Sequence, residues 1–233
     1  MYNFLPLITG FLGALAHVLS GPDHLAAVTP FAIEEKQRAW KIGMFWGLGH
    51  ISGMLLIGLL FAIFRNYIPV EKVSGYSEFF VGIILIGIGI WAIMKATNSK
   101  LSTKIFHIHF NEKPYTHYHK GDIHTHKEDK VNSKAKVIQN KASAYYVGTI
   151  HGFAGIAHFL LFLPVLGFTS VLEITNYLIG FAVGTITAMS IYAFLLGKIA
   201  HFFHSSNKSI FKNLRIFSGI LAIIVGIFWI VAN

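Results

Sequence analysis

The sequence contains no cysteine. A chain without thiols cannot form disulfides, carry out thiol redox chemistry or offer soft thiolate ligands to copper(I) or iron–sulfur clusters. Any metal that this chain binds must therefore be held by nitrogen and oxygen atoms. The phosphate-binding pattern G-x4-G-K-[ST] is also absent. An ATP-driven motor, if one exists, would have to be a separate chain.

Charged residues are scarce. Only 12% of the 233 residues are charged, whereas 54% are hydrophobic, and the mean hydropathy is +0.60. Such a chain has too few polar side chains to cover a soluble globule. Apart from Asp23, six runs lack charge, and each is long enough or nearly long enough to cross about 30 Å of hydrocarbon. The runs are 1–33, 42–64, 79–94, 142–172, 174–197 and 216–233. Because residues 1–16 carry no positive charge, we expect the first span to be retained rather than cleaved as a signal.

A histidine motif occurs twice. The pattern H-x3-G-x2-H-x5-P begins at His17 and again, 134 residues later, at His151. The match continues at a slowly growing offset, since residues 49–54 align with 184–189 and residues 80–83 with 217–220. Three spans per copy would insert the second copy upside down. We predict an all-α integral membrane protein with six transmembrane helices in two inverted three-helix repeats.

The predicted units are a first repeat at 1–98, a linker at 99–141 and a second repeat at 142–233. The first and fourth apolar runs are too long for simple helices, because about 30 residues at about 1.5 Å each reach about 45 Å. We expect the first helix to break at Gly21-Pro22, since proline cannot donate the backbone hydrogen bond. Asp23 is then placed to cap a new half-helix that begins near His24. Three residues weaken the fourth run: Gly152, Gly155 and Pro164.

Ionisable residues inside the apolar runs are the candidate metal ligands. Each carboxylate deep in a span costs about 2.5–3.5 kcal/mol, so Asp23 should have a partner: a divalent cation, a histidine proton or a helix end. Neutral imidazole with carboxylate suits nickel, cobalt or zinc. Histidines that only hydrogen-bond between helices are the simpler alternative, which their symmetric repetition disfavours. The predicted site residues are His17, Asp23, His24, His50, His151 and His158.

The linker carries six further histidines, arranged as three H-x-H pairs. Imidazoles in a flexible loop chelate divalent metals, so we expect an accessory metal contact that tunes transport without being essential. The polar, lysine-rich composition of 99–141 predicts little fixed structure. The accessory residues are His107, His109, His117, His119, His124 and His126.

The formal net charge of +9 is distributed unevenly. If the spans alternate, 17 lysines and arginines fall on one side of the membrane and 2 on the other. Positive charge marks the cytoplasmic side. This asymmetry predicts both termini outside and residues 99–141 in the cytoplasm, and we expect a bacterial inner membrane. It also argues against nucleic acid as a partner.

Two motifs resemble a known family. Residues 16–27, Ala-His-Val-Leu-Ser-Gly-Pro-Asp-His-Leu-Ala-Ala, look like the signature of the UreH-type nickel permeases, relatives of the nickel/cobalt transporter family. Residues 45–52 are similar to the second-span motif of the wider group. The nickel/cobalt pattern has four residues between the first histidine and the aspartate, whereas five separate His17 from Asp23. This departure favours the UreH-type branch. The family also includes exporters, so the direction of transport stays open.

These observations predict a secondary transporter, not an enzyme, that takes up Ni²⁺ or Co²⁺ by alternating access. The metal would be a substrate held near the membrane midplane, and no resident cofactor is expected. The expected partners are the metal ion, the lipid bilayer and a cytoplasmic metal acceptor protein. One alternative is an exporter with the same site. A membrane metalloenzyme is a weaker one, because the sequence lacks the H-x3-H and H-x2-H-H clusters of such enzymes.

Overall fold

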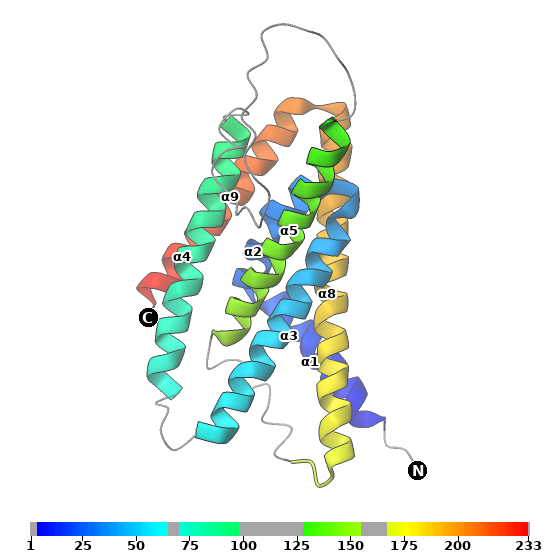
Figure 1. Cartoon of the computed structure of the whole chain (residues 1–233), viewed down its shortest axis with the longest axis vertical. Coiled ribbons are helices and arrows are strands. Elements are labelled where there is room, and N and C mark those ends of the chain that lie inside the picture. Colours follow the sequence, from blue (N-terminus) through cyan, green and yellow to red (C-terminus); the bar gives the residue numbers. More distant parts are fainter. Residues whose placement is uncertain (1–3, 65–69, 98–127, 155–166, 233) are drawn as a thin grey trace, which may run out of the picture.

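The computed structural model describes residues 4–64, 70–97, 128–154 and 167–232. Every regular element in these ranges is helical. The elements are α1 (Leu5–Ser20), α2 (Pro22–Glu35), a 3₁₀ turn (Lys36–Arg38), α3 (Ala39–Phe64), α4 (Val70–Thr97), α5 (Glu128–Phe153), α8 (Val171–Ser206) and α9 (Lys208–Val231). In the view of Figure 1, α1, α2, α4 and α8 run upward, whereas α3, α5 and α9 run downward.

Within the described residues, four helical stretches are long and apolar enough to cross a membrane, as judged by length and composition. They are Pro22–Leu60, Tyr76–Thr97, Val171–Ser206 and Lys208–Val231. The first of these contains α2 and most of α3. Helix α1 is apolar but shorter, with 16 residues, and α5 carries charged residues along its N-terminal half. The all-helical class predicted from the sequence is therefore confirmed.

The first helix breaks where the sequence predicts. Helix α1 ends at Ser20, Gly21 is extended with φ −91° and ψ 94°, and α2 begins at Pro22. Proline suits the first position of a helix because its missing N–H would have no partner there. The predicted capping role of Asp23 is wrong, since Gly21 occupies the N-cap position and no side chain caps the helix. Asp23 lies two residues after the N-cap position, and its oxygens accept hydrogen bonds from histidines instead.

The fourth apolar segment also departs from a simple span. Helix α5 ends at Phe153, next to Gly152, while Gly155 and Pro164 lie outside the described residues. The same helix begins at Glu128, inside the segment 99–141 for which we expected little fixed structure. The last part of that segment is thus helical and continues into the membrane-type sequence that follows.

Close helix packing places the centre of α3 against α5. A Cβ atom at Gly152 would overlap the carbonyl oxygen of His50, and one at Gly148 would overlap the carbonyl oxygen of Trp46. Only glycine permits two helices to approach so closely at these positions. This contact fixes the distance between His50 on α3 and His151 on α5.

Ion pairs hold the C-terminal end of α2. The carboxylate of Glu34 lies 2.7 Å from Lys95 Nζ on α4 and 2.5 Å from an Arg215 nitrogen on α9. The neighbouring Glu35 accepts a hydrogen bond of 2.5 Å from Asn140 on α5. Helix α2, which carries two of the predicted site residues at its other end, is therefore tied to three helices.

Candidate metal centre

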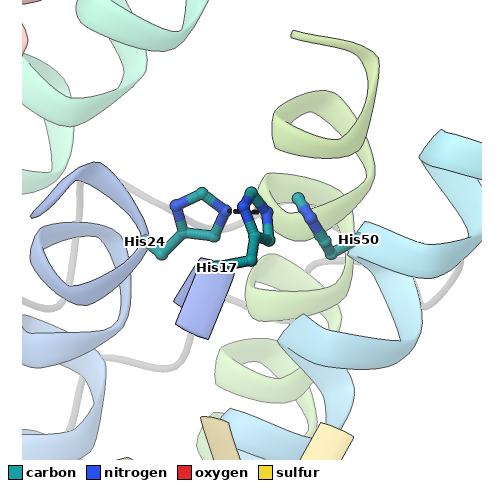
Figure 2. Close-up of side chains that lie close together, drawn as sticks. All are labelled: His17, His24 and His50. Atoms are coloured by element: carbon teal, nitrogen blue, oxygen red, sulfur yellow. Dashed lines mark hydrogen bonds between the residues drawn. The ribbon is translucent and has the colours of Figure 1, made fainter. Parts of the chain in front are cut away.

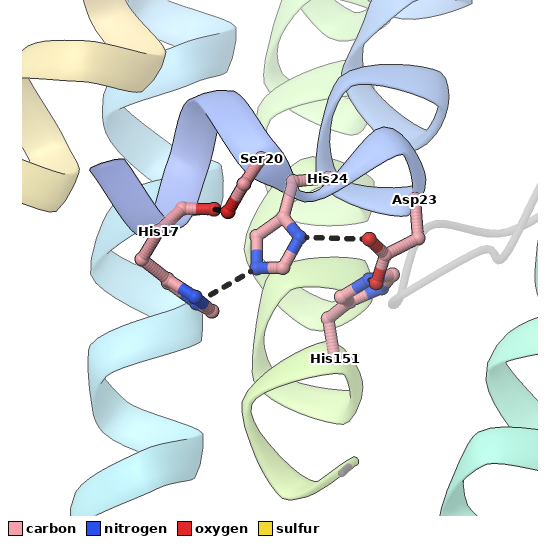
Figure 3. Close-up of polar contacts among 5 residues, drawn as sticks. All are labelled: His17, Ser20, Asp23, His24 and His151. Atoms are coloured by element: carbon pink, nitrogen blue, oxygen red, sulfur yellow. Dashed lines mark hydrogen bonds and ion pairs between the residues drawn. The ribbon is translucent and has the colours of Figure 1, made fainter. Parts of the chain in front are cut away.

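Four helices contribute to one cluster of imidazoles and a carboxylate. His17 lies in the last turn of α1, Asp23 and His24 in the first turn of α2, His50 in the middle of α3 and His151 near the end of α5 (Figures 2 and 3). Helices from both predicted repeats therefore meet at this point.

The break at Gly21 brings His17 and His24 together. Their Nε2 atoms lie 3.1 Å apart, and their ring centroids are 4.6 Å apart. In an unbroken helix, residues seven apart are separated by about 10.5 Å along the axis. The kink therefore converts two positions on one helix face into a pair in direct contact, as Figure 2 shows.

Asp23 joins two of the histidines. Its Oδ1 accepts a hydrogen bond of 3.0 Å from His24 Nδ1, and its Oδ2 accepts one of 2.7 Å from His151 Nε2 (Figure 3). The side chains of Asp23 and His151 are almost wholly buried, at 9% and 2% exposed. A buried carboxylate needs such partners. Of the three partners that the sequence allowed for Asp23, the structure places histidines beside it.

His50 completes a second side of the cluster. It is fully buried, and its ring centroid lies 5.0 Å from that of His24 and 5.8 Å from that of His17. Two three-residue groups have ligand atoms that all lie within 4.8 Å of one another. Ligands on one ion, with bonds of about 2.0–2.1 Å to nitrogen, are separated by about 3–4 Å. Small side-chain rotations would therefore place either group on a metal ion. The groups are His17, His24 and His50, and Asp23, His24 and His151.

Trp46 forms an aromatic wall that the sequence analysis did not identify. Its indole stacks on the His50 ring with centroids 4.9 Å apart and planes at 11°, and it lies 5.3 Å from His24 and 5.5 Å from His151. It is fully buried. The signal was present in the sequence, because residues four apart share one face of a helix and Trp46 precedes His50 by four.

Five of the six predicted site residues thus come together. The sixth, His158, lies outside the described residues, and so do all six histidines of the linker, from His107 to His126. Chemically, the cluster offers four imidazoles and one carboxylate in a largely buried environment. This set can coordinate a borderline divalent metal ion.

The chain is similar to one family model and to several known proteins. The model of the family described as the cytochrome c biogenesis protein transmembrane region matches residues 5–228. The chain is 30% identical over 198 residues to the urease accessory protein UreH of Bacillus sp. (strain TB-90). This alignment covers 84% of this chain and 78% of UreH. The resemblance to UreH found in the sequence motifs is thereby confirmed, and the wider link to the nickel/cobalt transporter family stays a prediction.

Two plant proteins are also similar. The chloroplast proteins FOR GROWTH AND FERTILITY 1 and 2 of Arabidopsis thaliana are 31% and 28% identical to this chain over 94% and 97% of its length. The chain spans little more than half of each, at 57% and 56%. No solved structure is significantly similar.

Proposed function

The chain belongs to the family of the cytochrome c biogenesis protein transmembrane region and is a homologue of the urease accessory protein UreH; we propose that this multi-pass membrane protein transports a divalent transition metal ion. Ni²⁺ is the proposed substrate and Co²⁺ the second choice. The motif at residues 16–27, which resembles that of UreH-type nickel permeases, favours nickel. We propose uptake across a bacterial inner membrane.

The observation that carries this proposal is the buried cluster around His24. Ionisable groups within membrane segments are costly and usually mark an ion path. Here four imidazoles lie in one cluster with a single carboxylate, and they come from four helices rather than from one interface. A purely structural role would require only enough partners to satisfy Asp23, which His24 and His151 already do. The adjacent imidazoles of His17 and His50 are better explained as metal ligands.

We further propose six spans in two inverted repeats. The crossing of α4 and α9 supports this symmetry. A Cβ atom at Gly82 would overlap the backbone of Gly226, and one at Gly89 would overlap the backbone of Gly219. At the repeat offset of 137, Gly219 corresponds to Gly82 and Gly226 corresponds to Gly89. Exchanging the two repeats therefore turns the Gly82–Gly226 contact into the Gly89–Gly219 contact. This exchange is what a pseudo-two-fold axis between the helices requires.

A second pair of contacts obeys the same symmetry. A Cβ atom at Gly49 would overlap the backbone of Tyr145, where α3 meets α5. A Cβ atom at its counterpart Gly184 would overlap the backbone of Phe11, where α8 meets α1. The corresponding helices also run in opposite directions: α3 descends and α8 ascends in Figure 1. In such a fold the central site is exposed to either face in turn as one repeat rocks against the other.

The remaining parts of the proposal concern sidedness and partners. Both termini would lie outside and residues 99–141 in the cytoplasm, as the lysine and arginine asymmetry indicates. The six linker histidines would pass metal to or from a cytoplasmic acceptor protein, and His158 would complete or mirror the central ligands. Transport by this chain cannot use thiol–disulfide exchange, because it has no cysteine.

The test is the accumulation of radioactive Ni²⁺ by cells that lack their own nickel uptake, with Co²⁺ and Zn²⁺ as competitors. We expect the wild-type chain to raise accumulation and His24→Ala to abolish the increase. His201→Ala is the matched control, because His201 lies at the end of α8 and bonds Gln37 rather than the cluster. Lowered accumulation would identify an exporter. Unchanged accumulation at normal membrane abundance would contradict metal transport.

A further inference from the structure

We propose that the metal centre contains two overlapping positions that share His24, and that the transported ion moves from one position to the other. This inference rests on the proposed transport of a divalent metal. The first position is formed by His17, His24 and His50. The second is formed by Asp23, His24 and His151. His24 is the residue common to both.

The two ring nitrogens of His24 face different groups. Nε2 lies 3.1 Å from His17 Nε2, and Nδ1 lies 3.0 Å from Asp23 Oδ1. Figure 3 shows the ring between these two neighbours. A neutral imidazole has one nitrogen with a free lone pair, while the other carries a proton. His24 can therefore bind one ion at a time, through Nε2 in the first position or through Nδ1 in the second. The positions exclude each other, and each chain holds one ion.

In each position, one ring nitrogen of His24 binds the ion and the other makes a hydrogen bond that orients the ring. When Nε2 binds the ion, the Nδ1–H group donates to Asp23, which is the carboxylate–histidine–metal arrangement that fixes ligand geometry in many proteins. For Nδ1 to bind the ion, its proton must leave by way of Asp23 Oδ1, and Nε2 must take up a proton by way of the half-buried His17, so that His24 stays neutral. The Nε2–H group then donates to His17 Nε2. The imidazole of His24 thus keeps a hydrogen-bond partner in both states.

Charge and burial give the two positions different tasks. The first consists of neutral imidazoles and includes His17, which is only half-buried, so it is suited to exchange ions with the exterior of the protein. The second contains the carboxylate of Asp23, and all three of its residues are buried. Negative charge in a poorly solvated site attracts a cation more strongly. The second position is therefore the holding position.

Trp46 lies beside both positions. Its ring stacks on His50 of the first and lies 5.5 Å from His151 of the second. The ring centroids of His50 and His151 are 6.3 Å apart, whereas each lies 5.0 Å from the ring centroid of His24. His24 is therefore the histidine nearest to both groups.

The test uses the purified full chain in detergent, titrated with Co²⁺ alone and followed by calorimetry and visible absorption. His50→Gln and His50→Ala remove a ligand of the first position only, and His151→Gln and His151→Ala one of the second only. The glutamine variants keep the cavity filled, and size-exclusion chromatography checks folding. We expect one equivalent bound by wild type and by all four variants, with different absorption spectra for the His50 and His151 variants. His24→Ala should bind at least tenfold more weakly, and His201→Ala should behave as wild type.

Cellular uptake completes the test. Variants at His50 and His151 should bind Co²⁺ yet lose most Ni²⁺ uptake, because transfer needs both positions. Two equivalents bound by wild type would overturn mutual exclusion. Equal loss of binding in the His24, His50 and His151 variants would indicate a single site to which all three histidines contribute. That result would overturn the two positions but not the proposed transport. A wild-type chain that binds neither Co²⁺ nor Ni²⁺ would instead overturn the transport function itself.

Discussion

His151 Nε2 lies 2.7 Å from Asp23 Oδ2, although 128 positions separate the two residues in the chain. The contact joins the first turn of α2 to the end of α5, and so links the two predicted repeats at the metal centre. A carboxylate from one half and an imidazole from the other can act on the same ion only because of this approach. Changes on either side should therefore disturb the same function.

Asp23→Asn should reduce Ni²⁺ uptake as strongly as His24→Ala. The amide keeps the size of the side chain but removes the negative charge that balances the cation. Loss of a hydrogen bond to a charged group costs about 1.5–3 kcal/mol, which corresponds to roughly 10- to 100-fold weaker binding. Initial uptake rates, normalised to membrane abundance, measure the effect. Normal uptake by Asp23→Asn would argue that the ion does not bind at this centre.

Trp46 should report metal binding by its fluorescence. Bound Ni²⁺ or Co²⁺ would lie within a few ångströms of the indole, because Trp46 stacks on His50 and contacts His24. We expect metal to quench part of the tryptophan emission in the wild-type chain, and the quenching to fall sharply in Trp46→Phe. Trp40→Phe is the control, since Trp40 is 41% exposed and lies at the start of α3. Equal quenching in the wild type and Trp46→Phe would place the metal elsewhere.

Gly152→Ala should impair both stability and uptake. The added Cβ atom would overlap the carbonyl oxygen of His50, so α5 would have to move away from α3 and carry His151 with it. Gly58→Ala in α3 is the matched control, because a Cβ atom there meets nothing within 4 Å. Alanine is favoured over glycine in a helix by about 1 kcal/mol, so this variant should be neutral or slightly stabilised. Melting temperature in detergent and Ni²⁺ uptake distinguish the two variants.

Replacement of the six linker histidines by serine should change the apparent affinity for Ni²⁺ by a modest factor. These imidazoles have no counterpart in the repeat, and the polar composition of the linker suits an accessory chelator. Uptake measured over a range of Ni²⁺ concentrations should show a shifted half-saturation with the maximal rate retained. Complete loss of uptake at normal abundance would make the linker part of the obligatory path.

A reporter enzyme that works only outside the cytoplasm should be active when it is fused after Asn233. The prediction follows from the asymmetric lysines and arginines, which favour a cytoplasmic position for residues 99–141 and the opposite side for both termini. A second reporter inserted near Gly121 should show the opposite activity. Cytoplasmic activity at Asn233 would contradict six spans and the inverted repeat together.

The class of the protein, the break in the first helix and the candidate ligands could all be predicted from the amino-acid sequence. Hydropathy, the geometry of Gly21-Pro22 and the positions of histidines in apolar runs are local properties, so they can be read without knowing which helices are neighbours. The role of Asp23 was harder to predict, because a carboxylate at the start of a helix can cap it or bind another group, and the neighbours decide which.

Which side chains meet depends on how the helices pack. Three contacts depend on how closely α2, α3 and α5 approach one another. Asp23 contacts His151, Trp46 stacks on His50, and His24 belongs to both ligand groups. The approach of α3 and α5 is set by the fit of Gly148 and Gly152 against the backbone of α3. Such contacts join residues that are distant in the chain, and no local pattern specifies their distance. The sequence therefore supplied the ligands, and helix packing arranged them into a centre.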